Sequence, residues 1–166
     1  MTIQISEYID VKKRALELRC NAPSKLAILP RNFKVAKSKD ELLHEGSVST
    51  IRVLWRQAGI SETRIEKEGE RFPVIQEKAF EEWIGPIIFV GASMLSQNPH
   101  TISVAFEVIS NYLTDWFKGI PGDKKVKLDV VVEETKVKVC KRIHYEGNIE
   151  GLQELPRIVR EVDSHE

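Results

Sequence analysis

The segment that most constrains the fold is the uncharged stretch WIGPIIFVGASMLSQNPHTISVAF, which runs from Trp83 to Phe106. A membrane-spanning helix needs roughly 20 mostly apolar residues. The polar and helix-breaking residues SQNPHT interrupt this stretch, so each apolar half is too short to cross a bilayer. The first half, 83–95, is therefore predicted to be a buried helix or strand that packs against a helix beginning at Pro99. A hydrophobic interface with a partner is the alternative.

The length of the chain fits one domain, because domains commonly contain roughly 100 to 200 residues. Of its 166 residues, 42% are hydrophobic and 30% are charged, which is typical of an ordinary globular protein without long disordered tracts. We expect a single globular domain over 1–163, with a possible weak subdivision near 82–99 and a loose tail at 164–166.

The charges balance, with 25 basic and 25 acidic residues. A chain of nearly zero net charge does not favour a polyanionic partner, and it resists self-association only weakly, so a homo-oligomer is plausible. Basic residues predominate in 1–39 and acidic residues in 146–166. These ends are either two differently charged surfaces or regions that meet, within one protomer or between two.

The two cysteines, Cys20 and Cys140, belong to no CxxC or Cys/His cluster, so the sequence predicts neither a disulfide framework nor a zinc site. We expect no cofactor. The N-terminal residues MTIQISEYIDVKKRALELRC lack the apolar segment behind basic residues that is typical of a signal peptide. A cytoplasmic location without a membrane span is expected.

Apolar residues at helical spacing predict most of the secondary structure. The expected helices are 6–19 with Ser6 as a cap, 38–43, a helix through 48–58 that ends at Gly59, a long helix from Pro99 to Gly119, and a final helix within 149–162. Pro156 requires this last helix either to kink or to begin near Leu155, because proline inside a helix removes a hydrogen bond.

Strands are expected where apolar residues are continuous or alternate. The segment KLAILP predicts a short buried strand, and the residues around Glu68 and Gly69 suggest a hairpin followed by a helical turn toward Trp83. Residues 126–145 alternate around a short link and predict an antiparallel hairpin. The expected fold class is α+β, with about five or six helices on a small antiparallel sheet and a final helix that covers the hairpin.

Signatures of common enzymes are absent: the chain has no phosphate-binding loop, dinucleotide fingerprint, HExxH or GxSxG. The most enzyme-like pattern is Asp129 and Glu133 in LDVVVEETK, which suggests a metal-dependent phosphodiesterase with Lys136 orienting the nucleophile. The spacing argues against it, because Glu134 and Lys136 are expected in the link of the hairpin. A solvated hairpin with gatekeeping charges is the simpler interpretation.

A nucleic-acid-binding regulator is a second alternative. Residues 37–60 have the outline of a helix-turn-helix whose second helix exposes Arg52, Arg56 and Gln57, side chains suited to reading base edges. Basic residues at alternate positions of the hairpin could add phosphate contacts, namely Lys136, Lys138 and Arg142. Nearby acidic residues and the absence of a net positive charge oppose this hypothesis.

Aromatic residues end the long helix, and such residues are enriched in binding hot spots as well as in cores. A partner interface is therefore a hypothesis for Tyr112, Trp116 and Phe117. Together with the missing catalytic motifs, these observations favour a non-enzymatic protein-binding or self-associating accessory subunit that acts in a multi-protein assembly. Its partner would be another protein or a second copy of the chain.

Overall fold

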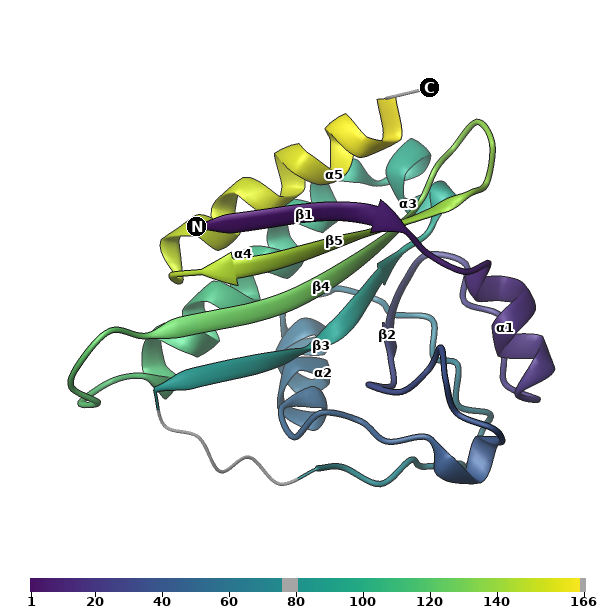
Figure 1. The fold of residues 1–166 in the computed structure, drawn as a ribbon, viewed down its shortest axis with the longest axis horizontal. Helices are drawn as coiled ribbons and strands as arrows, with labels where there is room; N and C mark the ends of the chain where they lie inside the picture. The colour runs from purple at the N-terminus through teal and green to yellow at the C-terminus, as the bar shows by residue number, and fades with distance from the viewer. Residues whose placement is uncertain (76–80, 165–166) are drawn as a thin grey trace.

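The computed structural model describes residues 1–75 and 81–164. Its centre is a five-stranded mixed sheet with the strand order β1-β5-β4-β3-β2. Strands β3 and β4 are parallel, and the other neighbouring pairs are antiparallel (Figure 1). The strands are β1 (Thr2–Glu7), β2 (Leu26–Leu29), β3 (Glu82–Val90), β4 (Lys125–Glu133) and β5 (Cys140–Gly147).

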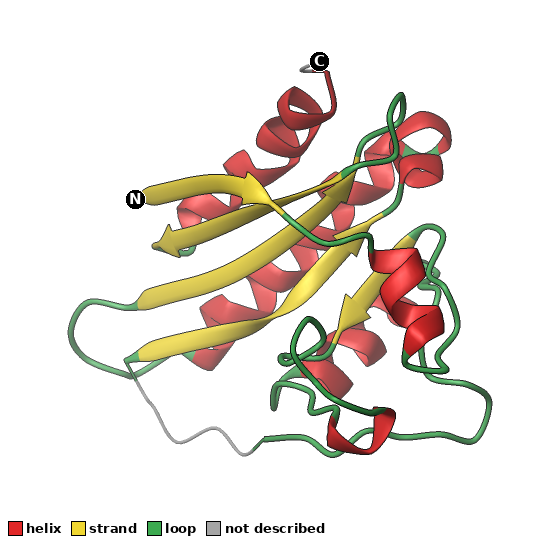
Figure 2. Ribbon diagram, turned by 45° about the vertical axis from the view of Figure 1, so that its right-hand side comes forward, coloured by secondary structure: helices red, strands yellow, loops and turns green. Residues whose placement is uncertain are grey.

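The described residues also form five α-helices and two short 3₁₀ helices, against an expected five or six helices. They are α1 (Val11–Glu17), η1 (Lys39–Glu41), α2 (Val48–Gln57), α3 (Ala92–Gln97), α4 (Pro99–Trp116), η2 (Glu150–Glu154) and α5 (Leu155–Ser164). Figure 2 shows α4 and α5 packed along one face of the sheet. The α+β class and the final helix that covers the β4–β5 hairpin are confirmed.

Two apolar clusters lie on opposite faces of the sheet. The larger cluster joins α2, α4 and α5 to alternate residues of the strands, including Val130 and Ile143. The smaller cluster packs α1 and the loop after β2 against the other face, over Phe89 and Val131. This second layer covers only part of its face, and charged side chains from β4 and β5 occupy the rest.

The uncharged stretch that dominates the sequence forms β3, α3 and the first turns of α4. Ile88, Phe89 and Val90 are completely buried, so the second half of β3 is core, whereas Ile84 is 45% exposed. Burial of such side chains contributes about 1.5–3 kcal/mol each. Among the described residues, no helix is long and apolar enough to span a membrane.

The helix boundaries follow from local chemistry. α4 begins at Pro99, where a missing N–H costs nothing because the first helical N–H groups have no intrahelical acceptor. α5 begins at Leu155 after η2, so Pro156 lies in its first turn. The helix start near Leu155, rather than a kink, is therefore the observed solution. α5 extends to Ser164, whereas 165–166 of the expected tail lie outside the described residues.

The prediction of a helix from Ser6 to Arg19 is wrong in its first part. Ser6 belongs to β1, and α1 begins only at Val11, with the Asp10 side chain accepting a hydrogen bond from the N–H of Lys13. The alternating TIQISE segment pairs instead with β5, which is distant in the sequence. Tertiary pairing here overrides the local helical pattern.

Other expectations also need correction. The sheet is mixed, because α4 crosses between the parallel strands β3 and β4. No hairpin forms around Glu68 in the described residues; this region is a loop with one isolated bridge between His44 and Val74. The helical turn expected before Trp83 falls partly on 76–80, outside the described residues. The helix expected at 38–43 is only the 3₁₀ turn η1.

Candidate functional site: an open strand edge beside an apolar groove

The two edges of the sheet differ in how they are covered. At the β2 edge, the N–H of Thr63 donates a hydrogen bond to the carbonyl oxygen of Leu26 at 2.7 Å, and all four residues of β2 are completely buried, so this edge is covered. At the other edge, β1 pairs with β5 on one side only, and no described segment lies along its outer side. β1 is therefore the open edge.

Hydrogen bonding between β1 and β5 determines which backbone groups face outward. The N–H of Tyr8 donates to the carbonyl oxygen of Cys140 at 3.0 Å, and the same register continues with Ser6 opposite Arg142. In an antiparallel pair, alternate residues bond to the neighbouring strand. The N–H and C=O groups of Ile3, Ile5 and Glu7 therefore point away from the sheet and can pair with another strand.

The outer edge of β1 lacks the usual protection against such pairing. Natural proteins block open edges with proline, lysine, a bulge or a covering segment. TIQISE contains neither proline nor lysine, its one charged residue, Glu7, stands at the end of the strand, and its register with β5 is continuous. The side chain of Ile5 is 54% exposed. The strand thus offers both backbone hydrogen bonds and apolar surface.

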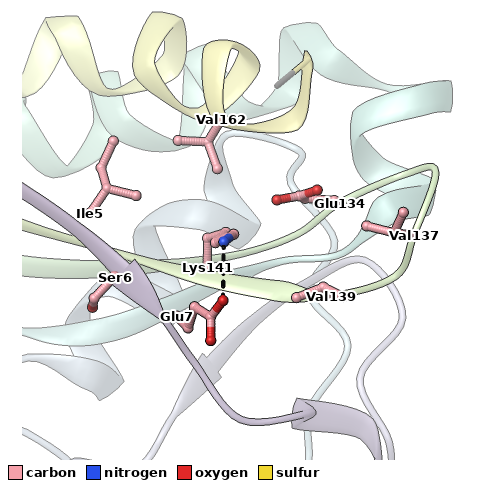
Figure 3. Close-up of a pocket in the computed structure, with 8 residues that line it drawn as sticks. All are labelled: Ile5, Ser6, Glu7, Glu134, Val137, Val139, Lys141 and Val162. Carbon is pink, nitrogen blue, oxygen red and sulfur yellow. Dashed lines mark ion pairs between the residues drawn. The ribbon is translucent and has the colours of Figure 1, made fainter. Parts of the chain in front are cut away.

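An apolar groove adjoins this edge. It has a volume of about 520 Å³ and lies between β1, the C-terminal turns of α5 and the turn that joins β4 to β5 (Figure 3). Ile5, Val137, Val139 and Val162 supply apolar walls. An ion pair of 3.7 Å between Lys141 and Glu7 borders the groove. Val137 and Val139 are 61% and 45% exposed, so their side chains can still be buried by a partner.

A second cluster lies on the open face of the sheet and centres on His144. Its Nδ1 lies 2.5 Å from Oδ1 of Asp129, and its Nε2 lies 3.0 Å from Oε1 of Glu146. Arg142 holds the second oxygen of Asp129 at 3.0 Å. Burial alone would lower the pKa of His144, but hydrogen bonds with Glu146 and Asp129 outweigh it and raise the pKa.

This histidine cluster is poorly suited to catalysis. Both ring nitrogens of His144 are occupied by carboxylates, so neither offers a free lone pair to a substrate or a metal. Within residues 1–75 and 81–164, no group of three His, Cys, Asp or Glu side chains could hold a metal ion. The arrangement instead ties β4 to β5 across the sheet.

The residues of the phosphodiesterase hypothesis are engaged elsewhere. Asp129 and Glu133 do share one face of β4, as the alternation predicts. Glu133, however, accepts a hydrogen bond from the N–H of Ala92 and pairs with Lys12 at 3.3 Å, whereas Asp129 pairs with His144 and Arg142. The two carboxylates therefore have separate partners.

The proposed nucleic-acid residues lie in two distant regions. Arg52, Arg56 and Gln57 belong to α2, whereas the turn after β4 holds Lys136 and Lys138 at the other end of the molecule (Figure 1). β5 begins only at Cys140, so the expected alternation of basic residues along one strand from Lys136 is not formed. Arg142 pairs with Asp129.

The aromatic residues of the predicted partner interface belong largely to the core. Phe117 is buried, and Tyr112 and Trp116 are half-buried against the larger cluster. Tyr112 packs edge-on to Trp83, with ring centroids 6.4 Å apart. Contact of Tyr112 or Trp116 with a partner stays a prediction.

The oppositely charged ends do not meet through ion pairs inside the described protomer. The basic residues of 1–39 that form ion pairs use acids outside 146–166, such as Glu45, Glu70 and Glu133. A contact between these regions of two protomers stays a prediction.

Comparison with protein-family models, curated proteins and solved structures gives no match to this chain. The functional argument therefore depends on its own geometry. Sequence reasoning missed the two residues that matter most at the open edge, Ile3 and Ile5. The strict alternation of polar and apolar residues in TIQISE was the available signal, because it is the pattern of a half-buried strand.

Proposed function

We propose that this chain is a self-associating, protein-binding subunit, and that a second copy pairs with it through β1. The observation that carries the proposal is the open edge of β1, with its outward N–H and C=O groups and its exposed Ile5. Strand addition to an open edge is a common mode of protein recognition, in which backbone hydrogen bonds supply affinity. The product would be a continuous ten-stranded sheet across a two-fold axis.

The sequence of β1 is complementary to itself. When two copies run antiparallel with their Gln4 residues opposite each other, Thr2 faces Ser6 and Ile3 faces Ile5. Ile3 and Ile5 carry outward backbone groups, so this register forms hydrogen bonds at both isoleucines of each copy. Each of these pairs within Thr2–Ser6 then joins side chains of similar polarity, which favours pairing.

Charge also favours this register. On the open face of the sheet, Ser6 lies beside Arg142 and Thr2 lies beside Glu146. Because Ser6 of one copy faces Thr2 of the other, Arg142 of one copy and Glu146 of the other lie in the same row of residues across the two-fold axis. Rows of opposite charge therefore meet, and like charges are kept apart.

The apolar groove extends the contact beyond one strand. Ile3, Ile5 and Glu7 share the face of β1 toward α5, where Val162 lines the groove. In the proposed register, Ile3 of the second copy lies next to Ile5 at the mouth of the groove. A single strand buries less than the roughly 1,200–2,000 Å² of a stable complex, so this added apolar area matters. We expect a dimer that dissociates measurably on dilution.

Sedimentation velocity over a dilution series tests the proposal with two variants. Ile5→Lys places a charge where Ile3 of the second copy would pack, and it should shift the protein to monomer. Val35→Lys is the matched control, because Val35 is an exposed valine in a loop, 74% exposed and away from the sheet edge. We expect this control to dimerise like the wild type. A monomeric wild type at all concentrations, or dimerisation unchanged by Ile5→Lys, would contradict the proposal.

A further inference from the structure

A second cavity lies between α2 and the loop 64–74, apart from the β1 edge. Its volume is about 310 Å³, at the lower end of the roughly 300–1,000 Å³ of small-molecule sites. Helical spacing brings one face of α2 to this cavity, namely Ser49, Arg52, Val53 and Arg56. Arg64, Arg71 and Phe72 approach from the loop.

A buried ion network forms one wall of the cavity. The guanidinium of Arg52 donates to both carboxylate oxygens of Glu66, at 2.6 and 3.0 Å, and its Nε lies 2.8 Å from Glu62. Nε2 of His44 lies 3.2 Å from Glu66. Burial alone would raise the pKa of Glu66, but hydrogen bonds from His44 and Arg52 outweigh it and lower the pKa to about 2. The carboxylate of Glu66 is therefore ionised, and Arg52 holds it in place.

Two features of the cavity lining are available to a ligand. His44 is only 2% exposed, yet its Nδ1 has no hydrogen-bond partner, although buried polar atoms almost always have one. Arg56 and Arg71 also line the cavity, and neither forms an ion pair with any residue of 1–75 or 81–164. The cavity lining thus contains two arginines without ion pairs and a buried histidine nitrogen without a hydrogen-bond partner.

The charge of the lining indicates the chemistry of the ligand. Four arginines face two glutamates, and Arg52 already engages Glu66 while Lys39 engages Glu70 at 2.8 Å. The exposed side chains of Arg56 and Arg71 therefore have no counterion among residues 1–75 and 81–164. A guanidinium matches phosphate oxygens with two parallel hydrogen bonds, and a phosphate monoester carries a charge of about −1.5 to −2 at neutral pH.

We propose that this cavity binds a small phosphate monoester, with Arg56 and Arg71 donating hydrogen bonds to the phosphate oxygens and the buried ring of His44 lining the site. The lining also contains an apolar wall of Phe72, Val53 and Val74, which suits a compact apolar group on the ester. This site is independent of the β1 edge, so either can exist without the other.

Isothermal titration with three probes tests the chemistry: inorganic phosphate, phenyl phosphate and benzoate. We expect phenyl phosphate to bind most tightly, inorganic phosphate to bind more weakly and benzoate to bind least. Benzoate that binds as tightly as phenyl phosphate would contradict the phosphate assignment. The absence of saturable binding by either phosphate probe would overturn the site.

Variants then assign the arginines. The double variant Arg56→Gln with Arg71→Gln should weaken phenyl phosphate binding by at least about tenfold, since each lost partner is a charge-assisted hydrogen bond. Arg160→Gln is the matched control, an exposed helical arginine outside this cavity, and it should bind like the wild type. Equal binding by the double variant and the control would overturn the assignment.

Nuclear magnetic resonance of the histidine rings gives a readout that does not depend on a variant. Phenyl phosphate should shift the Nδ1 resonance of His44 and leave the ring of His144, on the open face of the sheet, unchanged. Saturable binding without a shift at His44 would place the ligand elsewhere and would refute the site.

Discussion

The N–H of Thr63 donates a hydrogen bond to the carbonyl oxygen of Leu26 at 2.7 Å, at the covered edge of the sheet. The opposite edge, β1, has no comparable cover among the described residues. A sheet with one closed and one open edge can add a strand on one side only. Pairing of two such open edges gives a closed dimer rather than an extending fibre, because a two-fold contact uses the same surface on both copies.

Protonation of Glu66 should destabilise the fold in acid. Its pKa is about 2 in the folded protein, below the ordinary value of 4.5. Ionised Glu66 therefore contributes about 3 kcal/mol to the free energy of unfolding at pH values above its ordinary pKa. This contribution is lost as the pH falls toward 2. Chemical denaturation between about pH 5 and about pH 2 should show a steeper loss of stability in the wild type than in Glu66→Gln.

Glu68→Gln provides the control for that experiment, because Glu68 is an exposed glutamate of the same loop. This variant should keep the steep acid dependence of the wild type. Identical acid profiles for the wild type and Glu66→Gln would show that the Arg52–Glu66–His44 network contributes nothing to acid stability.

The His144 cluster predicts the opposite pH dependence. Since partners raise the pKa of His144, its stabilising contribution is complete below the ordinary pKa of about 6.5 and is lost as the pH rises through the folded value. The free energy of unfolding should therefore decrease in this range for the wild type. His144→Gln should flatten the profile, and Asp129→Asn, which removes one partner, should weaken the dependence. If the free energy of unfolding of His144→Gln depended on pH as that of the wild type does, the cluster would not be the cause of the dependence.

Gly91 should tolerate no side chain at the junction between β3 and α3. Its N–H donates to the carbonyl oxygen of Lys25 at 2.7 Å, and an added Cβ would collide with the carbonyl of Ser24. Gly91→Ala should lower the free energy of unfolding by about 1–3 kcal/mol, as overpacking usually does. Ala92→Gly, one residue later, removes a buried methyl without this collision and provides a comparison in the same denaturation series. A Gly91→Ala variant as stable as the wild type would show that the backbone at Ser24 can move away.

Local sequence patterns predict the helices and strands that are determined by residues close together in the sequence. The helix beginning at Pro99, the helix over Val48–Gln57 and the β4–β5 hairpin all follow from nearby caps, turns and alternation. For the final helix, the sequence leaves a kink at Pro156 and a start near Leu155 as alternatives, and the start at Leu155 is observed. These features depend on contacts close in the sequence.

The remaining features depend on contacts far apart in the sequence. The sequence predicts no strand at β1 and assigns Ser6 and Glu7 to a helix, because the strand partner, β5, lies more than a hundred residues away. The parallel pairing of β3 with β4 likewise requires α4 to cross between them. The cavity beside Arg56 is assembled from α2 and the loop 64–74, and sequence reasoning detected its arginines on α2 but neither Arg71 nor the buried His44–Glu66 pair.

Disulfide trapping at Gln4 tests the central claim, the two-fold pairing of β1, most directly. In the proposed register, the two Gln4 residues face each other in a pair without backbone hydrogen bonds, where Cα atoms are about 4.5 Å apart and a disulfide can form. Both native cysteines, Cys20 and Cys140, are buried and free. Gln4→Cys should therefore form a covalent dimer under mild oxidation. Ser6→Cys alone should not, but it should cross-link to Thr2→Cys when the two variants are mixed. Failure of Gln4→Cys to cross-link, or equal cross-linking by Ser6→Cys alone, would contradict the account.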